Sequence, residues 1–283
     1  MSKKIAIVAD SSGSLPEEVL KEHNIHTSYL MIIFGTESYQ EFKEITPSKF
    51  LELSEAQQEL PSTSQPSPGV TVELYESLLS DGYDEIIHIT ISSGLSGAYQ
   101  SALSAAEMVN PDKIHVFDSE SVAWPQGALA IEASKMVNQG LDSPEIIEKL
   151  NVLKATQHIS ASVKTLENLR KGGRLSNASA VIGGVLQIKP IVSMINGKLE
   201  AVGKVRTFNK AIATLIETVK NANLDTTYEV AIMHMQNLED ASTLKSAIEE
   251  IVPGITVNIL PLSLVVSVHV GEGTIGVTWI KTS

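Results

Sequence analysis

Short apolar runs alternate with longer amphipathic segments through the first half of the chain. Residues 4–9 (KIAIVA) and 85–91 are continuous apolar runs that end in polar turns. Such runs are typical of strands buried on both faces of a parallel sheet. The segments between them have the apolar spacing of helices, and the alternation predicts a mostly parallel sheet flanked by helices. The remaining predictions for this half are strands over residues 26–34 and 113–118, helices over 15–22, 47–58, 70–80, 126–139 and 144–155, and a helix from the turn at 92–97 to about residue 109.

The pattern changes near residue 157. Asn196-Gly197 separates two strand-like runs, residues 188–195 and 198–206, and is the strongest short signal for an antiparallel hairpin. Further strands are predicted over residues 159–163, 229–234, 256–260 and 276–280, with helices over 210–221 and 238–251 and a loop over 269–273. We therefore expect two α/β domains, residues 1–156 with a mostly parallel sheet and residues 157–283 with a mixed sheet that contains the hairpin.

Composition and charge exclude several classes of function. At 283 residues the chain is longer than one hydrophobic core usually supports. Its formal charge of −12 and lack of a Lys/Arg run argue against a nucleic-acid partner. The absence of cysteine excludes disulfides and thiolate metal sites, and we expect no bound metal. No segment approaches the ~20 apolar residues of a membrane span, and the first apolar run is too short for a signal peptide, so we expect a cytoplasmic protein.

Common catalytic motifs are missing. Residues 271–276 (GEGTIG) match the dinucleotide pattern G-x-G-x-x-G, but that motif requires a following helix, and the last seven residues are strand-like. The sequence contains no G-x-x-x-x-G-K-[ST], no G-x-S-x-G and no H-E-x-x-H. An ATPase, serine hydrolase or zinc protease of the usual kinds is therefore not expected.

Three polar loops remain as candidates for a binding site. They are Asp10-Ser11-Ser12, Ser62-Thr63-Ser64-Gln65 within an expected exposed loop at residues 60–69, and Ser92-Ser93-Gly94-Leu95-Ser96-Gly97. The first and third follow predicted parallel strands, so they should lie at the same edge of one sheet. Hydroxyl and backbone N–H donors near helix N-termini form an anion site without cationic side chains. Taken singly, the same residues are more simply explained as helix caps and turn residues, and it is their expected convergence on one sheet edge that favours a binding site.

Two other features carry charge or a titratable group. His269 lies between apolar residues just before a glycine turn, which suits either a structural histidine or one that handles a proton or phosphate. Arg170 and Arg174 flank two glycines in the segment RKGGR. In such an acidic protein, this basic turn is a candidate contact for a partner or a phosphate. His88 and His234, within predicted strands, are expected to be core or strand-end residues.

The motifs together resemble the DegV family, in the family's order and over nearly the whole chain. They are Asp10-Ser11-Ser12, Thr63-Ser64-Gln65-Pro66-Ser67, the turn from Ser92 to Gly97 with Ala98-Tyr99-Gln100-Ser101-Ala102 after it, Leu169-Arg170-Lys171-Gly172-Gly173-Arg174, and His269-Val270-Gly271. The resemblance implies two α/β domains and a bound long-chain fatty acid, with the carboxylate near the domain junction and the tail in an apolar tunnel. It implies no cofactor. Some members of the family serve a separate ATP-dependent kinase subunit, which phosphorylates the bound carboxylate.

The resemblance also assigns roles to individual residues. It places Thr63 and Ser93 on the carboxylate, with Ser96 and Ser64 behind them and His269 beside it. Arg170 and Arg174 become candidates for the kinase contact or for phosphate stabilisation. The chain departs from the family at Glu272, usually proline, and at Ala98, commonly threonine. Residues 178–186 and 191–195 are a candidate tunnel lining, although ordinary core packing explains them equally well.

Two other functions fit the same loops. One is a stand-alone phosphotransferase or hydrolase of a small substrate, which would turn over alone and carry no lipid. The other is a lipid carrier or sensor without a kinase partner. The function we expect is fatty-acid binding by a protein that is not an enzyme on its own. The sequence does not exclude either alternative.

Overall fold

The computed structural model describes residues 3–56, 60–176 and 188–283. The chain divides into two compact units. The first comprises residues 1–155 with 263–265, and the second comprises residues 156–262 with 266–283. The candidate tunnel residues 178–186 lie outside the described residues.

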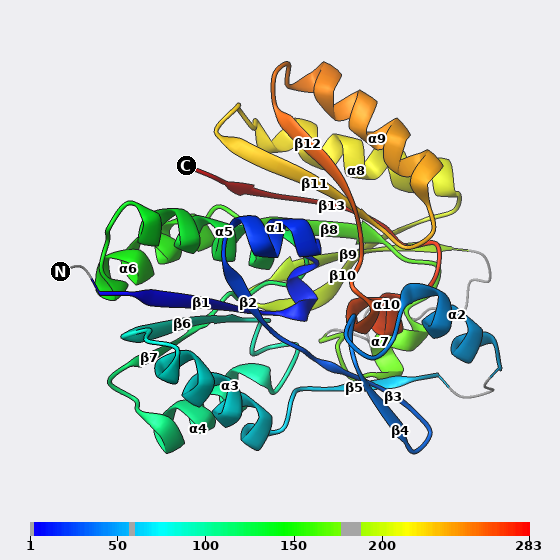
Figure 1. Ribbon diagram of the computed structural model, residues 1–283. Helices are drawn as coiled ribbons and strands as arrows, with labels where there is room; N and C mark the ends of the chain where they lie inside the picture. The colour runs from blue at the N-terminus through cyan, green and yellow to red at the C-terminus, as the bar shows by residue number, and fades with distance from the viewer. Residues whose placement is uncertain (1–2, 57–59, 177–187) are drawn as a thin grey trace. The chain divides into compact units, whose positions relative to one another are not determined.

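A four-stranded parallel sheet forms the centre of the first unit. Its strand order is β2 (Ile25–Ser28), β1 (Ile5–Asp10), β6 (Glu85–Thr90) and β7 (Ile114–Asp118). Helices α3 (Pro68–Ser80) and α4 (Ala98–Val109) cover one face, and α5 (Trp124–Asn138) and α6 (Ser143–Lys154) lie over the other (Figure 1). β1 and β6 are buried along their whole length, because both faces of the sheet are covered. The predicted α/β class with a mostly parallel sheet is confirmed.

The single strand predicted over residues 26–34 is wrong, because the chain changes sheets within it. β2 ends at Ser28, and β3 (Met31–Phe34) pairs instead in a small antiparallel sheet. That sheet has the order β4 (Glu37–Gln40), β3, β5 (Ser62–Ser64), so part of the expected loop at 60–69 is a strand. The N–H of Leu30 donates to the Ser11 hydroxyl at 3.1 Å, which holds the chain where it leaves the parallel sheet. Helices α1 (Glu17–Glu22) and α2 (Pro47–Ala56) complete this unit.

The second unit contains the predicted mixed sheet. Its strand order is β10 (Lys198–Val205), β9 (Lys189–Ile195), β8 (His158–Ser162), β13 (Ile275–Lys281), β11 (Tyr228–His234) and β12 (Thr256–Pro261). The hairpin β9–β10 is confirmed, and its turn residues Asn196 and Gly197 have φ of 49° and 74°, as a two-residue turn of this kind requires. Helices α8 (Phe208–Ala222) and α9 (Leu238–Ile251) lie side by side over the sheet and bury its apolar face (Figure 1).

Two shorter helices complete the second half of the chain. They are α7 (Glu167–Lys171) and α10 (Leu264–Val270). The loop predicted from residue 269 therefore begins later, because α10 continues through His269.

Glu41 is a fully buried carboxylate at the start of α10. Its Oε2 accepts a hydrogen bond from the Ser11 hydroxyl at 2.6 Å, and its Oε1 accepts one from the N–H of Val265 at 3.0 Å. Ser263 is held as well, since its N–H donates to the Ser14 hydroxyl at 3.1 Å. These bonds explain why Ser263–Val265 belong to the first unit, although the sequence assigned them to the second domain.

Glu41 should make stability depend on pH. Burial raises its pKa to about 7, although hydrogen bonds from Ser11, Ser263 and the backbone favour the charged form. The folded chain therefore holds this proton more tightly than the unfolded chain, whose carboxyl has a pKa near 4.5. The resulting contribution is present below pH 4.5 and declines towards pH 7, by up to about 3 kcal/mol at about 1.4 kcal/mol per pH unit.

We expect Glu41→Gln to remove this component, because glutamine does not titrate. Urea unfolding of both proteins across this pH range measures it: wild type should gain stability relative to the variant as the pH falls from about 7 towards 4.5. Glu22→Gln, on the exposed surface of α1, is the control and should leave the profile unchanged. A difference between wild type and Glu41→Gln that is constant with pH would contradict the prediction.

Candidate functional site

The carboxyl edge of the parallel sheet is fixed by a buried polar chain. Asp10, at the end of β1, accepts hydrogen bonds from the N–H of Ile91 at 2.9 Å and from His88 Nε2 at 3.1 Å. His88 Nδ1 lies 2.6 Å from the Tyr75 hydroxyl. A neutral imidazole that donates to Asp10 and accepts from Tyr75 satisfies all of these contacts. Because Ile91 directly precedes the turn at residues 92–97, Asp10 sets where that turn begins.

The turn at residues 92–97 is held mainly through its backbone. The N–H groups of Leu95 and Ser96 donate to the Ser92 carbonyl at 3.0 and 3.1 Å, and the N–H of Ser93 donates to Asp118 Oδ1 at 3.2 Å. The Ser96 hydroxyl accepts from the N–H of Ala98, the first residue of α4, at 3.2 Å. Ser93 itself is exposed, so its side chain faces solvent from a fixed backbone.

The segment that contains Thr63 and Ser64 packs against this turn. Thr63 and Ser64 are half-buried in β5, where they pair with Ile32 and Met31 of β3. A Cβ atom added at Gly97 would lie 3.2 Å from the side-chain amide nitrogen of Gln65, so the glycine allows this close approach. The Ser101 hydroxyl of α4 also donates to the Pro66 carbonyl at 3.2 Å. Two of the three predicted polar loops therefore lie side by side within the first unit.

The third loop, Asp10-Ser11-Ser12, lies at the same sheet edge but its side chains point inward. All three are buried, and each has a structural partner: His88 for Asp10, Glu41 for Ser11 and Gln126 for Ser12. This loop therefore supports the site from beneath.

In the second unit, His269 packs against the basic glycine turn. A Cβ atom added at Gly172 would lie only 2.6 Å from the His269 Nδ1, so residue 172 must be glycine for the imidazole to occupy this place. The guanidinium of Arg174 donates to the Gly172 carbonyl, and Arg170 is exposed at the end of α7. The structure thus brings together the late histidine and the RKGGR turn.

The surroundings of His269 keep its ring neutral. Burial is the main cause and the positive charge of Arg174 the second, and together they lower the pKa of His269 to about 4. At neutral pH the imidazole therefore offers one N–H donor and one acceptor nitrogen. It can donate a hydrogen bond to an anion without forming an ion pair with it.

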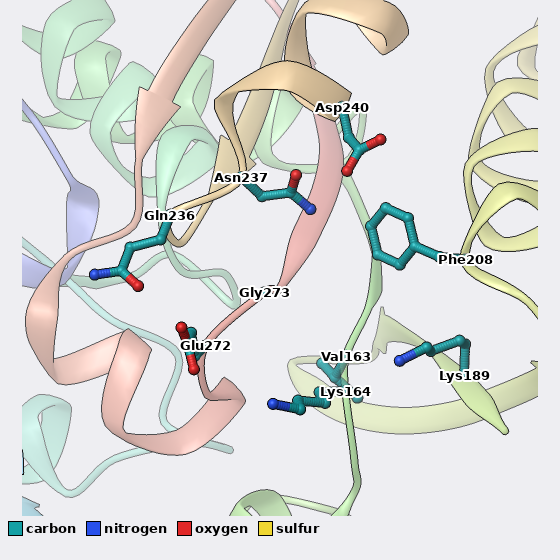
Figure 2. Close-up of a pocket in the computed structure, with 9 residues that line it drawn as sticks. All are labelled: Val163, Lys164, Lys189, Phe208, Gln236, Asn237, Asp240, Glu272 and Gly273. Atoms are coloured by element: carbon teal, nitrogen blue, oxygen red, sulfur yellow. The ribbon is translucent and has the colours of Figure 1, made fainter. Parts of the chain in front are cut away.

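Glu272 lines an open cavity of about 300 Å³ in the second unit (Figure 2). The residue is exposed, and Lys164 and Lys189 line the same cavity. The glycine pattern at 271–276 leads into β13 and not into a helix, as the sequence predicted. Among the described residues, no group of three or more His, Cys, Asp or Glu side chains is arranged to hold a metal ion. No helix in the described part of the chain is long and apolar enough to cross a membrane.

The seven predicted site residues thus fall into two groups. Thr63, Ser64, Ser93 and Ser96 lie in the first unit, and His269, Arg170 and Arg174 lie in the second. Their roles remain predictions. The sequence missed Glu41 and the pair of His88 with Tyr75, which hold the site in place. A single sequence gives little sign that a charged residue such as Glu41 is buried. His88, within the apolar strand 85–90, did indicate a buried polar contact.

The neutral state of His269 can be tested by NMR. We expect its imidazole to titrate near pH 4 in the wild type, and Arg174→Gln to raise that pKa while leaving it below 6.5, because burial is the larger cause. Arg170→Gln is the matched control, since Arg170 is not among the groups that shift this pKa. A wild-type titration near 6.5 would show that the ring is not buried as described.

Comparison with known proteins places these features in a family. The family model described as "Uncharacterised protein, DegV family COG1307" matches residues 4–282. The protein DegV of Bacillus subtilis is 36% identical over 277 residues, covering 97% of this chain and 98% of its own.

Solved structures agree. The crystal structure of DegV from B. subtilis, described as a fatty acid binding protein, has a TM-score of 0.89 at 34% identity and covers 99% of this chain and 100% of its own. A stearic-acid-binding protein from Eubacterium ventriosum has a TM-score of 0.89 at 26% identity, covering 99% of this chain and 98% of its own. The likeness extends over both units, and the chain belongs to the DegV family.

Proposed function

We propose that this chain binds a long-chain fatty acid and presents its carboxylate to a separate ATP-dependent kinase subunit, which forms an acyl phosphate. The observation that carries the proposal is the pair of hydroxyl-rich segments packed together in the first unit, in a family with solved members described as fatty-acid-binding proteins. In this assignment Thr63 and Ser93 hold the carboxylate, Ser64 and Ser96 support them, and His269 contributes a neutral donor.

The expected energetics favour a binding role. Burial of about 15 methylenes at ~0.8 kcal/mol each gives a gross gain of ~12 kcal/mol. A hydrogen bond to a charged group contributes ~1.5 to 3 kcal/mol before desolvation is subtracted. The acyl tail would therefore provide most of the affinity, and the hydroxyl groups would fix the position of the head.

Phosphoryl transfer requires a second protein in this proposal. A carboxylate oxygen attacks the γ-phosphorus of ATP, the bond to the β–γ bridging oxygen breaks, and ADP leaves as the acyl phosphate forms. The sequence has no phosphate-binding loop of its own. Arg170 is exposed on α7 and is thus available either to the kinase or to the phosphate.

Lipid extraction tests the binding step directly. We expect organic extract from the purified, never-denatured protein to contain about one long-chain fatty acid per chain by mass spectrometry. Absence of lipid, together with failure to load added fatty acid, would overturn the proposal and favour a small-substrate enzyme.

A substitution in the turn tests the head-group assignment. Ser93→Ala should weaken fatty-acid affinity about 10- to 100-fold through loss of one hydrogen bond to a charged group. Ser104→Ala is the matched control, because Ser104 is exposed on α4 and donates only to the Gln100 carbonyl of its own helix. Equal affinities for both variants would remove Ser93 from the site.

The partner contact makes a separate prediction. We expect Arg170→Glu to lower acyl-phosphate formation with the kinase subunit and ATP by at least about 10-fold, at unchanged lipid content, because the side chain is exposed and its loss leaves the fold intact. Lys220→Glu, exposed on α8 in the same unit, is the charge-matched control. If lipid-loaded wild type forms no acyl phosphate with the kinase, the carrier or sensor function is favoured. If Arg170→Glu acts like wild type, the contact lies elsewhere.

A further inference from the structure

The open cavity of the second unit lies where chains of this architecture often bind ligands. Its lining includes residues just after the ends of β8 and β11 and at the starts of α8 and α9. Examples are Val163, Asn237 and Phe208. In α/β sheets, ligands bind beyond the carboxyl ends of strands. The cavity therefore has a position typical of a binding site, and its residues all belong to one unit.

The charged residues around this cavity have no partners within the described chain. They are Lys164, Lys189, Asp240 and Glu272. Their side chains form no hydrogen bond or ion pair there. By contrast, Lys245 of the same unit pairs with a carboxylate at 2.9 Å.

Figure 2 shows how these charges are arranged. The ammonium groups of Lys164 and Lys189 lie on one side of the cavity, and the carboxylate of Asp240 lies at the opposite end. Glu272 lies on the side of Lys164, away from Asp240, and the ring of Phe208 lies between Asp240 and Lys189. The two positive and two negative charges cancel, so the cavity has no net attraction for a simple ion. Positive and negative charge are nevertheless separated between the lysine side and Asp240.

We propose that this cavity binds a small dipolar molecule that carries an ammonium group and an anionic group, carboxylate or phosphate, a few bonds apart. The anionic group pairs with Lys164 and Lys189, and the ammonium group pairs with Asp240. The ring of Phe208 offers its face to the cation. A volume of about 300 Å³ suits a molecule of this size, and the site needs neither a fatty acid nor a kinase.

Titration of the lipid-loaded full chain, followed by NMR, tests the inference. The probes are β-alanine and phosphoethanolamine, with acetate, inorganic phosphate and ethylammonium as singly functional controls at equal ionic strength. We expect saturable shifts around residues 164, 189, 240 and 272 with at least one dipolar probe, at least about 10-fold tighter than with any control. Comparison of the two dipolar probes decides between carboxylate and phosphate as the anionic group.

Variants at opposite sides of the cavity separate the two ends of the ligand. Lys164→Gln with Lys189→Gln, and Asp240→Asn, should each weaken the dipolar probe about 10-fold or more. Glu217→Gln with Lys220→Gln, exposed on α8, should not. Lipid content should be the same in all variants. The inference is overturned if no dipolar probe saturates. It is also overturned if inorganic phosphate binds as tightly as the dipolar probes and Asp240→Asn does not weaken binding of those probes.

Discussion

The buried carboxylate of Asp10 is the interaction on which the first unit's polar loops depend. It joins the end of β1 to the N–H of Ile91 at the end of the neighbouring strand, and His88 and Tyr75 complete its hydrogen bonds. Removal of the carboxylate would leave a buried backbone donor and a buried imidazole unsatisfied, at a cost of about 1–3 kcal/mol for each. The turn that contains Ser93 begins directly after Ile91, so its position follows from this buried contact.

Glu41 also joins distant segments through buried hydrogen bonds, but burial affects its charge more strongly than these bonds do. All of its partners are donors, yet burial outweighs them and raises its pKa to about 7, so the side chain is partly protonated under ordinary conditions. A partly protonated carboxyl group can hydrogen-bond to several segments without the cost of a full buried charge. It holds the first residues of α10, the helix that contains His269. Two buried carboxylates, Asp10 and Glu41, thus fix the backbone around the polar loops of the first unit.

The sequence predicted the elements whose conformation is determined by residues close together in the chain. Continuous apolar runs gave β1 and β6, and Asn196-Gly197 gave the hairpin, because these signals lie within a few residues. The break between β2 and β3 and the helix α10 were missed, since Leu30 and Val265 are held by residues distant in the sequence. The hydroxyl loops were recognisable as motifs, but only the structure shows that Asp10, Ser11 and Ser12 are buried supports while Ser93 is exposed.

The absence of a cation from the hydroxyl loops bears on the proposed chemistry. A carboxylate bound by a guanidinium would be stabilised as the anion and would be a weaker nucleophile towards phosphorus. In the proposed function, hydroxyl groups would orient the same carboxylate with less loss of reactivity. Burial first, and the positive charge of Arg174 second, lower the pKa of His269, so its imidazole is also an uncharged donor at neutral pH. A carboxylate held by uncharged donors would be fixed in place yet reactive, and the proposal then requires only that a partner deliver the phosphoryl group in line.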